Sequence, residues 1–156
     1  MNIQHILEII KIIKVLIMKF TMTILATILS LSVFAQIKPV NFDDCKPDKM
    51  FVQAEKEPKW KCDSISIVDF MNKYLNDKEL QNVIQGRVIV GILINEDGKT
   101  CCMSIFNLTK SDLNPIAFKE VVNKMPNWTP ALQNGKPVTF LKPQVFYIQD
   151  GKFIVK

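Results

Sequence analysis

Four cysteines are the side chains best suited to covalent chemistry in this chain of 156 residues. In an oxidising compartment, Cys45 and Cys62 could close a loop near the start of a domain. Cys101 and Cys102 are neighbours in a predicted strand, so their side chains point to opposite faces and cannot easily bridge each other. We therefore predict a disulfide between Cys45 and Cys62, provided that the chain is exported.

Metal binding and catalysis find little support in the same sequence. Thiolate zinc sites need closely spaced cysteines with further Cys or His ligands, and the one histidine, His5, lies in an apolar N-terminal stretch. The serines occupy predicted cap, helix, strand and turn positions without the signature of an activated nucleophile. Asp43 and Asp44 form a carboxylate pair in a polar segment, which is typical of solvated surface. We predict no metal, no cofactor, no small-molecule substrate and no catalytic residue.

The N-terminal stretch from Asn2 to Phe34 is almost continuously apolar. Lys19, an apolar run from Phe20 to Val33 and small residues before Ala35 give the three-part layout of a secretory signal peptide. We predict a leader over residues 1–35, cleaved after Ala35, with Met18 as an alternative true start. A second interpretation keeps Phe20 to Ile37 as an uncut membrane anchor, since this run approaches the length needed to span a bilayer.

The charge balance excludes one class of partner. The whole chain carries a formal net charge of +5. Without the leader's Lys11, Lys14, Lys19 and Glu8, the rest of the chain keeps +3, spread over scattered lysines. Nucleic-acid binding would call for a dense basic stripe, so we expect no nucleic acid as partner.

Hydrophobic periodicity places the elements of the exported part. Residues 36–48 read as a short polar connecting segment and residues 49–156 as one domain. Alternation after Met50 predicts a strand that Pro58 ends, and 3–4 spacing predicts a helix over 63–75 that Asp63 or Ser64 caps.

The second half of the domain has a firmer pattern. Period-two alternation from Gly86 predicts an antiparallel hairpin, 86–94 and 100–106, whose turn places Gly98 at positive φ. A second helix follows over 114–126, with Asn114 as cap and Pro115 at its first position. A last strand runs over 138–148. The order predicts an α+β fold, a small antiparallel sheet with two helices packed on one face.

Three features near the C-terminus shape that last strand. Trp128 most simply packs over the second helix, and the Asn134–Gly135 pair predicts a tight turn. Pro143 lies inside the strand and cannot donate to a ladder, so the strand is expected to be at an edge, or bulged, at that point.

These residues together resemble the C-terminal domain of TonB-type proteins, most of all the exported variants common in Bacteroidota. The resemblance covers about Met50 to Phe146. It rests on the family's G-x-V-x-V strand and D-G turn, its W-x-P-A and N-G-K-P-V motifs and its closing P-x-x-F. The matching residues are Gly86, Val88, Val90, Asp97, Gly98, Lys124, Met125, Pro126, Trp128, Pro130, Ala131, Asn134, Gly135, Lys136, Pro137, Val138, Pro143 and Phe146. A proline- and glycine-rich segment that often precedes the family's first helix is replaced here by "EPKWKCD".

The resemblance implies a TonB/TolA C-terminal-like fold and a role in transport across the cell envelope. TonB-type domains pair their last strand with a short segment of an outer-membrane transporter. Carried over to this chain, that strand is the partner-binding edge, and its residues are Gln144, Val145, Phe146, Tyr147, Ile148 and Gln149. The implied location is the periplasm, and the implied partner is an outer-membrane TonB-dependent transporter or another envelope protein.

Three alternatives stay open. The chain is a membrane-anchored component of energy transduction if the leader remains uncut, although residues 36–48 reach at most roughly 45 Å. It is a structural envelope domain or a homodimer if the open edge associates with itself. The C-terminal tail "GKFIVK" could also cover the edge, which would then bind nothing.

Overall fold

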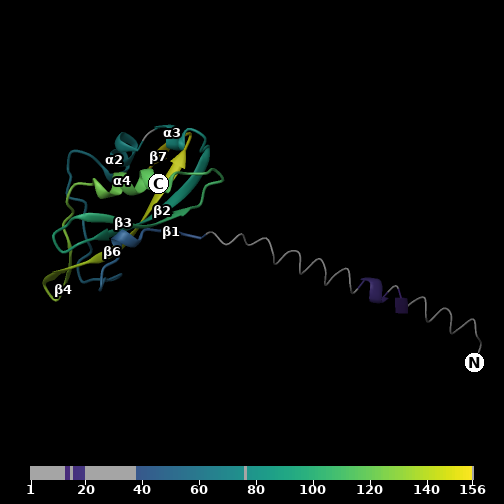
Figure 1. Ribbon diagram of the computed structural model, residues 1–156, viewed down its shortest axis with the longest axis horizontal. Helices are drawn as coiled ribbons and strands as arrows, with labels where there is room; N and C mark the ends of the chain where they lie inside the picture. The colour runs from purple at the N-terminus through teal and green to yellow at the C-terminus, as the bar shows by residue number, and fades with distance from the viewer. Residues whose placement is uncertain (1–12, 15, 20–37, 76, 156) are drawn as a thin grey trace, which may run out of the picture. The chain divides into compact units, whose positions relative to one another are not determined.

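The computed structural model describes residues 13–14, 16–19, 38–75 and 77–155 (Figure 1). The chain divides into two units, residues 1–36 and 37–156, and the few described residues of the first unit are helical. The predicted apolar run and the cleavage site after Ala35 lie outside the described residues. Within the described part, no helix is long and apolar enough to cross a membrane.

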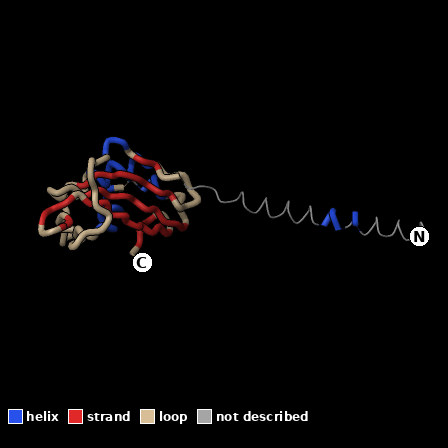
Figure 2. The backbone as a smooth tube through the Cα atoms, turned by 90° about the horizontal axis from the view of Figure 1, so that it is seen from below, coloured by secondary structure: helices blue, strands red, loops and turns tan. Residues whose placement is uncertain are grey.

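The second unit is built on a five-stranded antiparallel sheet (Figures 1 and 2). In spatial order the strands are β1 (Val40–Asn41), β3 (Thr100–Asn107), β2 (Gln85–Ile94), β6 (Phe140–Gln149) and β7 (Lys152–Ile154). The predicted hairpin is β2 and β3, and Gly98 in its turn has φ of +83°. A separate two-stranded sheet joins β4 (Ala131–Gln133) to β5 (Lys136–Val138).

Two of the three helices described in the second unit begin at a polar side chain that caps them. The three helices are α2 (Ile67–Tyr74), the short α3 (Asp77–Leu80) and α4 (Pro115–Asn123), and a 3-10 turn, η1, spans Asp43–Cys45. Asn114 caps α4 as predicted, since its side-chain oxygen accepts from the Ile116 N–H at 3.1 Å. The predicted cap of α2 was wrong: the Ser66 hydroxyl accepts from the Asp69 N–H at 3.1 Å, so the cap lies two residues beyond Ser64 and the helix begins at Ile67.

The core lies between the sheet and helices α2 and α4, which lie on the same face of the sheet (Figure 1). Val88, Val90 and Ile92 are fully buried on this face of β2, as the alternation predicted. They share one cluster with Phe70 and Met71 of α2 and with Phe118 and Val122 of α4. The α+β fold, a small antiparallel sheet with helices packed against it, is therefore confirmed. We call the opposite face of the sheet, turned away from α2 and α4, the reverse face.

The predicted strand after Met50 was wrong. Phe51 makes an isolated parallel bridge to Phe140, and Lys56 makes an isolated antiparallel bridge to Leu132. The segment thus pairs for one residue with β6 and then crosses to β4, so it never runs beside one neighbour long enough to form a strand.

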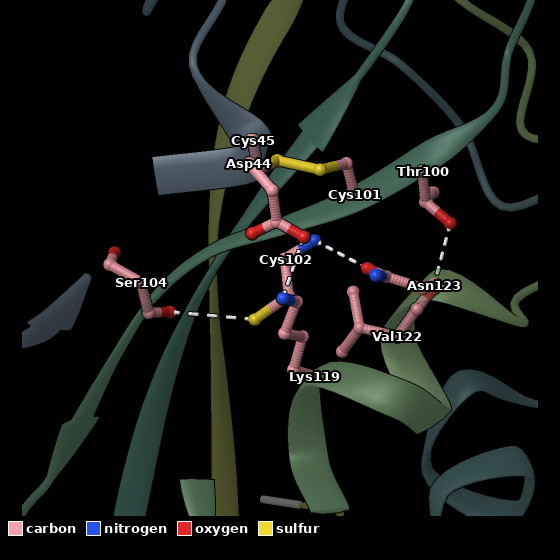
Figure 3. The surroundings of a disulfide bond; sticks show 9 residues. All are labelled: Asp44, Cys45, Thr100, Cys101, Cys102, Ser104, Lys119, Val122 and Asn123. Carbon is pink, nitrogen blue, oxygen red and sulfur yellow. Dashed lines mark hydrogen bonds and ion pairs between the residues drawn. A yellow bond between two sulfur atoms is a disulfide. The ribbon is translucent and has the colours of Figure 1, made fainter. Parts of the chain in front are cut away.

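The predicted disulfide between Cys45 and Cys62 was also wrong. Cys45 is bonded to Cys101, with the two Cα atoms 5.9 Å apart (Figure 3). The physical reason is the pairing of β1 with β3, which brings η1 beside Cys101, whereas Cys62 stays a half-buried free thiol 3.3 Å from the Ser64 hydroxyl. The opposite orientation of the neighbouring cysteines was correct: Cys102 is fully buried in the core, and burial raises the pKa of its thiol to about 12.

Candidate peptide-binding edge

The backbone of β6 divides its hydrogen-bonding groups between two sides. The Asp150 N–H donates to the Ile84 carbonyl at 2.8 Å, one position beyond the pairing of Gln85 with Gln149. Bonded pairs alternate along an antiparallel ladder, so the even-numbered residues of β6 bond to β2. The odd-numbered residues direct both backbone groups to the side away from β2, which we call the outer edge of β6.

Strand β7 covers the C-terminal part of this outer edge. Tyr147, Ile148 and Gln149 pair with Ile154, Phe153 and Lys152, after a turn in which Asp150 and Gly151 have φ of +49° and +73°. These three residues were predicted to belong to the open edge, and they do not, because the tail turns back and supplies a neighbouring strand. The alternative in which the tail covers the edge is therefore correct for this half of the predicted set.

The ring of Phe153 fixes β7 in place. Its side chain is only 3% exposed and lies 5.4 Å from the Phe146 ring and 6.0 Å from the Phe118 ring, centroid to centroid. Burial of a phenyl ring contributes about 1.5–3 kcal/mol. A strand of three residues can therefore stay paired although it contributes few ladder bonds.

Asn72 of α2 closes the free side of β7. Its side-chain oxygen accepts from the Phe153 N–H at 2.8 Å, and its side-chain nitrogen donates to the Phe153 carbonyl at 2.9 Å. One carboxamide thus takes the place of a neighbouring strand at the only residue of β7 whose backbone groups point away from β6. Such capping protects a sheet edge from pairing with other chains.

Phe51 covers the N-terminal end of the outer edge of β6. Its N–H donates to the Thr139 carbonyl at 2.9 Å, and its carbonyl accepts from the Leu141 N–H at 2.8 Å. These bonds confirm independently that the odd-numbered residues of β6 point outward. Beyond Phe51 the chain leaves the sheet.

Between these two covers lies an open segment of β6, Lys142–Phe146. Its outward groups are the Pro143 carbonyl and the N–H and carbonyl of Val145. The Val145 carbonyl accepts from the Gln144 side-chain nitrogen at 3.2 Å, which leaves one acceptor and one donor open within the described part of the chain. Of the predicted binding residues, Gln144, Val145 and Phe146 fall in this segment, although the Phe146 ring is 1% exposed and belongs to the core.

Pro143 fits this position without loss. An N–H at residue 143 would point outward, so its absence costs no bond to β2. The strand was expected to be outermost or bulged at Pro143. The pairing of β6 with β2 is continuous at Pro143, and β6 is an inner strand whose other neighbour, β7, does not reach this far.

The opposite lateral edge of the sheet is closed by the chain's own lead-in segment. Phe42 is 7% exposed and donates its N–H to the Met103 carbonyl at 3.0 Å, next to the disulfide. The Lys119 ammonium of α4 lies 2.6 Å from the Asp44 carboxylate (Figure 3). It also lies 4.9 Å from the centre of the Phe42 ring. The hydrogen bond from Lys119 lowers the pKa of Asp44.

Several residues that carry the resemblance lie in turns, and they fix the segment between α4 and β6. The backbone N–H of Trp128 donates to the Gly98 carbonyl at 2.9 Å, and a Cβ on Gly98 would collide with the Trp128 carbonyl oxygen. Trp128 is 3% exposed, belongs to the same buried cluster as Val122 of α4, and packs edge-on against Trp60, a contact that was not predicted. Asn134 and Gly135, at φ of +51° and +71°, form the predicted tight turn between β4 and β5.

The remaining motif residues have structural positions. A Cβ on Gly86 would lie 2.7 Å from a Thr109 methyl carbon, which explains the glycine. Pro126 follows α4 after the helix has ended at Asn123, Pro130 precedes β4, and Pro137 pairs with Leu132. None of these residues lies on the open segment of β6.

The described residues contain no cluster of His, Cys, Asp or Glu that could hold a metal ion. Three residues bound the open segment: sequence reasoning missed the roles of Phe51 and Asn72 and included Phe153 only as part of a tail that could cover the edge. A signal existed only for Phe153, since Asp150 and Gly151 form a second hairpin-turn pair between apolar residues.

Comparisons with known proteins give no relative for this arrangement. No protein-family model matches the chain. No curated protein and no solved structure matches it either.

Proposed function

We propose that this protein is a non-catalytic interaction module of the cell envelope that binds an extended peptide by strand addition to the open segment of β6. The observation that carries the proposal is the pair of open backbone groups, the Pro143 carbonyl and the Val145 N–H, on a strand otherwise covered at both ends. Pairing of an extended peptide with such a strand is a common mode of recognition. The resemblance to TonB-type domains supports the same use and suggests the periplasm as its location.

The order of the two groups favours a parallel peptide. In a parallel pair, a residue of one strand donates its N–H to a carbonyl of the neighbouring strand. The carbonyl of that same residue accepts from the N–H that lies two residues further along the neighbouring strand. Phe51 makes this pattern with Thr139 and Leu141. Pro143 and Val145 offer the same acceptor and donor, whereas an antiparallel peptide would have to share the Val145 carbonyl with the Gln144 side chain.

The open segment also limits the bound length. Five residues of strand extend about 17 Å, and Phe51 and β7 occupy the same row before and after them. The part of the peptide that pairs with β6 must therefore be short, and a longer peptide must turn away from the sheet at both ends of that part. Two backbone bonds contribute about 0.5–1.5 kcal/mol each, so backbone pairing alone gives weak binding and selectivity must come from side chains.

The proposed partner is an exposed extended segment of an outer-membrane TonB-dependent transporter. In the test, the full chain is kept in amphipol, immobilised and exposed to a bacterial outer-membrane extract. Mass spectrometry identifies the captured proteins. Cross-linking to residue 144 then maps the segment of the captured protein that contacts β6. Val145→Pro removes the open donor without breaking a bond to any residue that the structure describes. Val145→Thr is the matched control, since it keeps the N–H and a β-branched side chain.

We expect the unmodified chain and Val145→Thr to capture a transporter through a short segment cross-linked at β6, and Val145→Pro to lose it. Equal capture by Val145→Pro would contradict strand addition. Absence of any transporter from all three would contradict the proposed partner.

A further inference from the structure

The reverse face of the sheet contains a trough that starts at the open segment of β6. Gly91 of β2 pairs with Pro143 on one side and with Ser104 of β3 on the other. These three residues form one row across three strands, and each has a short side chain or none on the reverse face. The row is therefore lower than its neighbours, and we call it the Gly91 trough.

Larger apolar side chains form the walls of the trough. Ile89 and Phe106, paired with each other, stand on one side, and Leu141 and Val52 stand on the other. Together with the row of small residues they enclose a hollow of about 210 Å³. An apolar cavity of about 150 Å³ is enough to bind benzene, so this volume fits a phenyl ring or a leucine side chain. Val52, at 66% exposure, leaves a large apolar surface beside it.

Strand register decides which residue of a bound peptide would reach the trough. Phe51 bonds to β6 and pairs with Phe140, which is buried on the core face, and the next residue, Val52, lies on the reverse face. By the same alternation, the peptide residue bonded to Pro143 and Val145 would face the core side. The residue before it would lie on the reverse face beside Pro143, next to Val52 and at the mouth of the trough.

We propose that the Gly91 trough is the specificity pocket of the peptide site and takes one long apolar side chain, phenylalanine, leucine or methionine, from the residue beside Pro143. This inference rests on the proposed strand addition and adds the chemistry of the ligand. The side chain must be long because it has to pass over Pro143 to lie above Gly91. A short side chain at that position leaves the trough empty, and a charged one would lose its hydration there.

The test is a titration of the full chain in amphipol with capped five-residue peptides, followed by the backbone amide signals of Val145, Gly91 and Ser104 in NMR spectra. The peptides carry threonine at four positions and phenylalanine, leucine or alanine at the second. We expect all three to shift the Val145 signal. The phenylalanine and leucine peptides should bind at least about tenfold more tightly than the alanine peptide and should also shift Gly91 and Ser104.

Two variants fill the trough from different strands. Ser104→Leu fills it from β3 and should bring the phenylalanine peptide down to the affinity of the alanine peptide. Gly91→Ala raises the floor from β2, where the new Cβ would lie 2.5 Å from the rotatable Ser104 hydroxyl, and should act in the same direction. Arg87→Leu is the matched control for Ser104→Leu. It also adds a leucine to the reverse face, but on β2 and outside the trough, so the preference for the phenylalanine peptide over the alanine peptide should remain.

The outcomes separate this inference from the proposed function. If all peptides shift Val145 with equal affinity and leave Gly91 unchanged, strand addition stands and the pocket is refuted. If no peptide shifts Val145, strand addition itself is refuted and the pocket with it. If the preference for phenylalanine persists in both filled variants, the apolar residue binds elsewhere and the trough is refuted.

Discussion

The two lateral edges of the sheet are closed by different means. On the β1 side, a disulfide and the ion pair between Asp44 and Lys119 hold a lead-in segment with only a two-residue strand. On the β7 side, a buried ring and one carboxamide, those of Phe153 and Asn72, hold a three-residue strand. Short edge strands and capping groups protect sheets from uncontrolled pairing. The open segment of β6 lies elsewhere, between the part of β6 that Phe51 covers and the part that β7 covers.

The largest expected effect lies on the β7 side. Phe153→Ala removes a ring that contacts Phe146 and Phe118 in the core, and we expect the free energy of unfolding to fall by about 3–5 kcal/mol. Urea unfolding followed by tryptophan fluorescence measures this change. Ile154→Ala in the same strand is the control and should cost clearly less, because Ile154 is only half-buried. Equal costs for the two variants would mean that the ring does not anchor β7.

The disulfide is the next test, on the β1 side. Reduction, or the double change Cys45→Ser and Cys101→Ser, should lower the free energy of unfolding by about 2–4 kcal/mol, because the bond restricts the unfolded chain over a separation of 56 residues. Cys62→Ser, at the cysteine predicted to be its partner, should leave stability within about 0.5 kcal/mol. A loss that follows Cys62 instead would restore the pairing predicted from the sequence.

Proline substitution compares the covered and the open parts of one edge. Tyr147 and Val145 are two residues apart on β6 and direct their backbone groups to the same side, but only Tyr147 has a strand beside it. Tyr147→Pro breaks a ladder bond to Ile154 and should cost about 1–3 kcal/mol more than Val145→Pro. Chemical unfolding of both variants gives this difference directly. If both prolines cost the same, Val145 has an internal partner and the open segment is not open.

The sequence predicts those parts of the sheet that depend on the pattern of neighbouring residues. Alternation over β2 and turn chemistry at Gly98 depend on neighbouring residues only, and both are confirmed. The disulfide failed because the partner of Cys45 is chosen by the distant pairing of β1 with β3, for which a two-residue strand leaves almost no periodic signal.

Half of the residues predicted for the binding edge lie outside the open segment of β6 for a similar reason. Pro143 correctly marked a point on β6 without an outer neighbour. The covering of Tyr147 depends on the tail and on Asn72, whose carboxamide looks in the sequence like any polar residue on a helix surface. The trough could not be predicted, since it arises from the registered alignment of Pro143, Gly91 and Ser104 on three strands.

The smallest expected effect is the acid response of the β1 side. The hydrogen bond from Lys119 lowers the pKa of Asp44, so the folded state holds this carboxylate in its charged form more firmly than the unfolded chain does. The contribution is therefore fully present above the pKa of the unfolded state and is lost as pH falls through the lowered pKa of the folded state. The effect is small because Asp44 is exposed to solvent, which screens the pair.

We expect the stability difference between the unmodified chain and Asp44→Asn to shrink as pH falls below about 4 and to vanish below the lowered pKa of the folded state, while Lys119→Gln should lose the same pH-dependent part. Thermal unfolding between pH 7 and pH 2 measures it, and the β7 variant Phe153→Ala supplies the contrast, because its loss involves no ionisable group and should not depend on pH. A difference that persists at low pH would show that Asp44 acts through packing rather than charge. The two edges would then differ in their covalent bond alone.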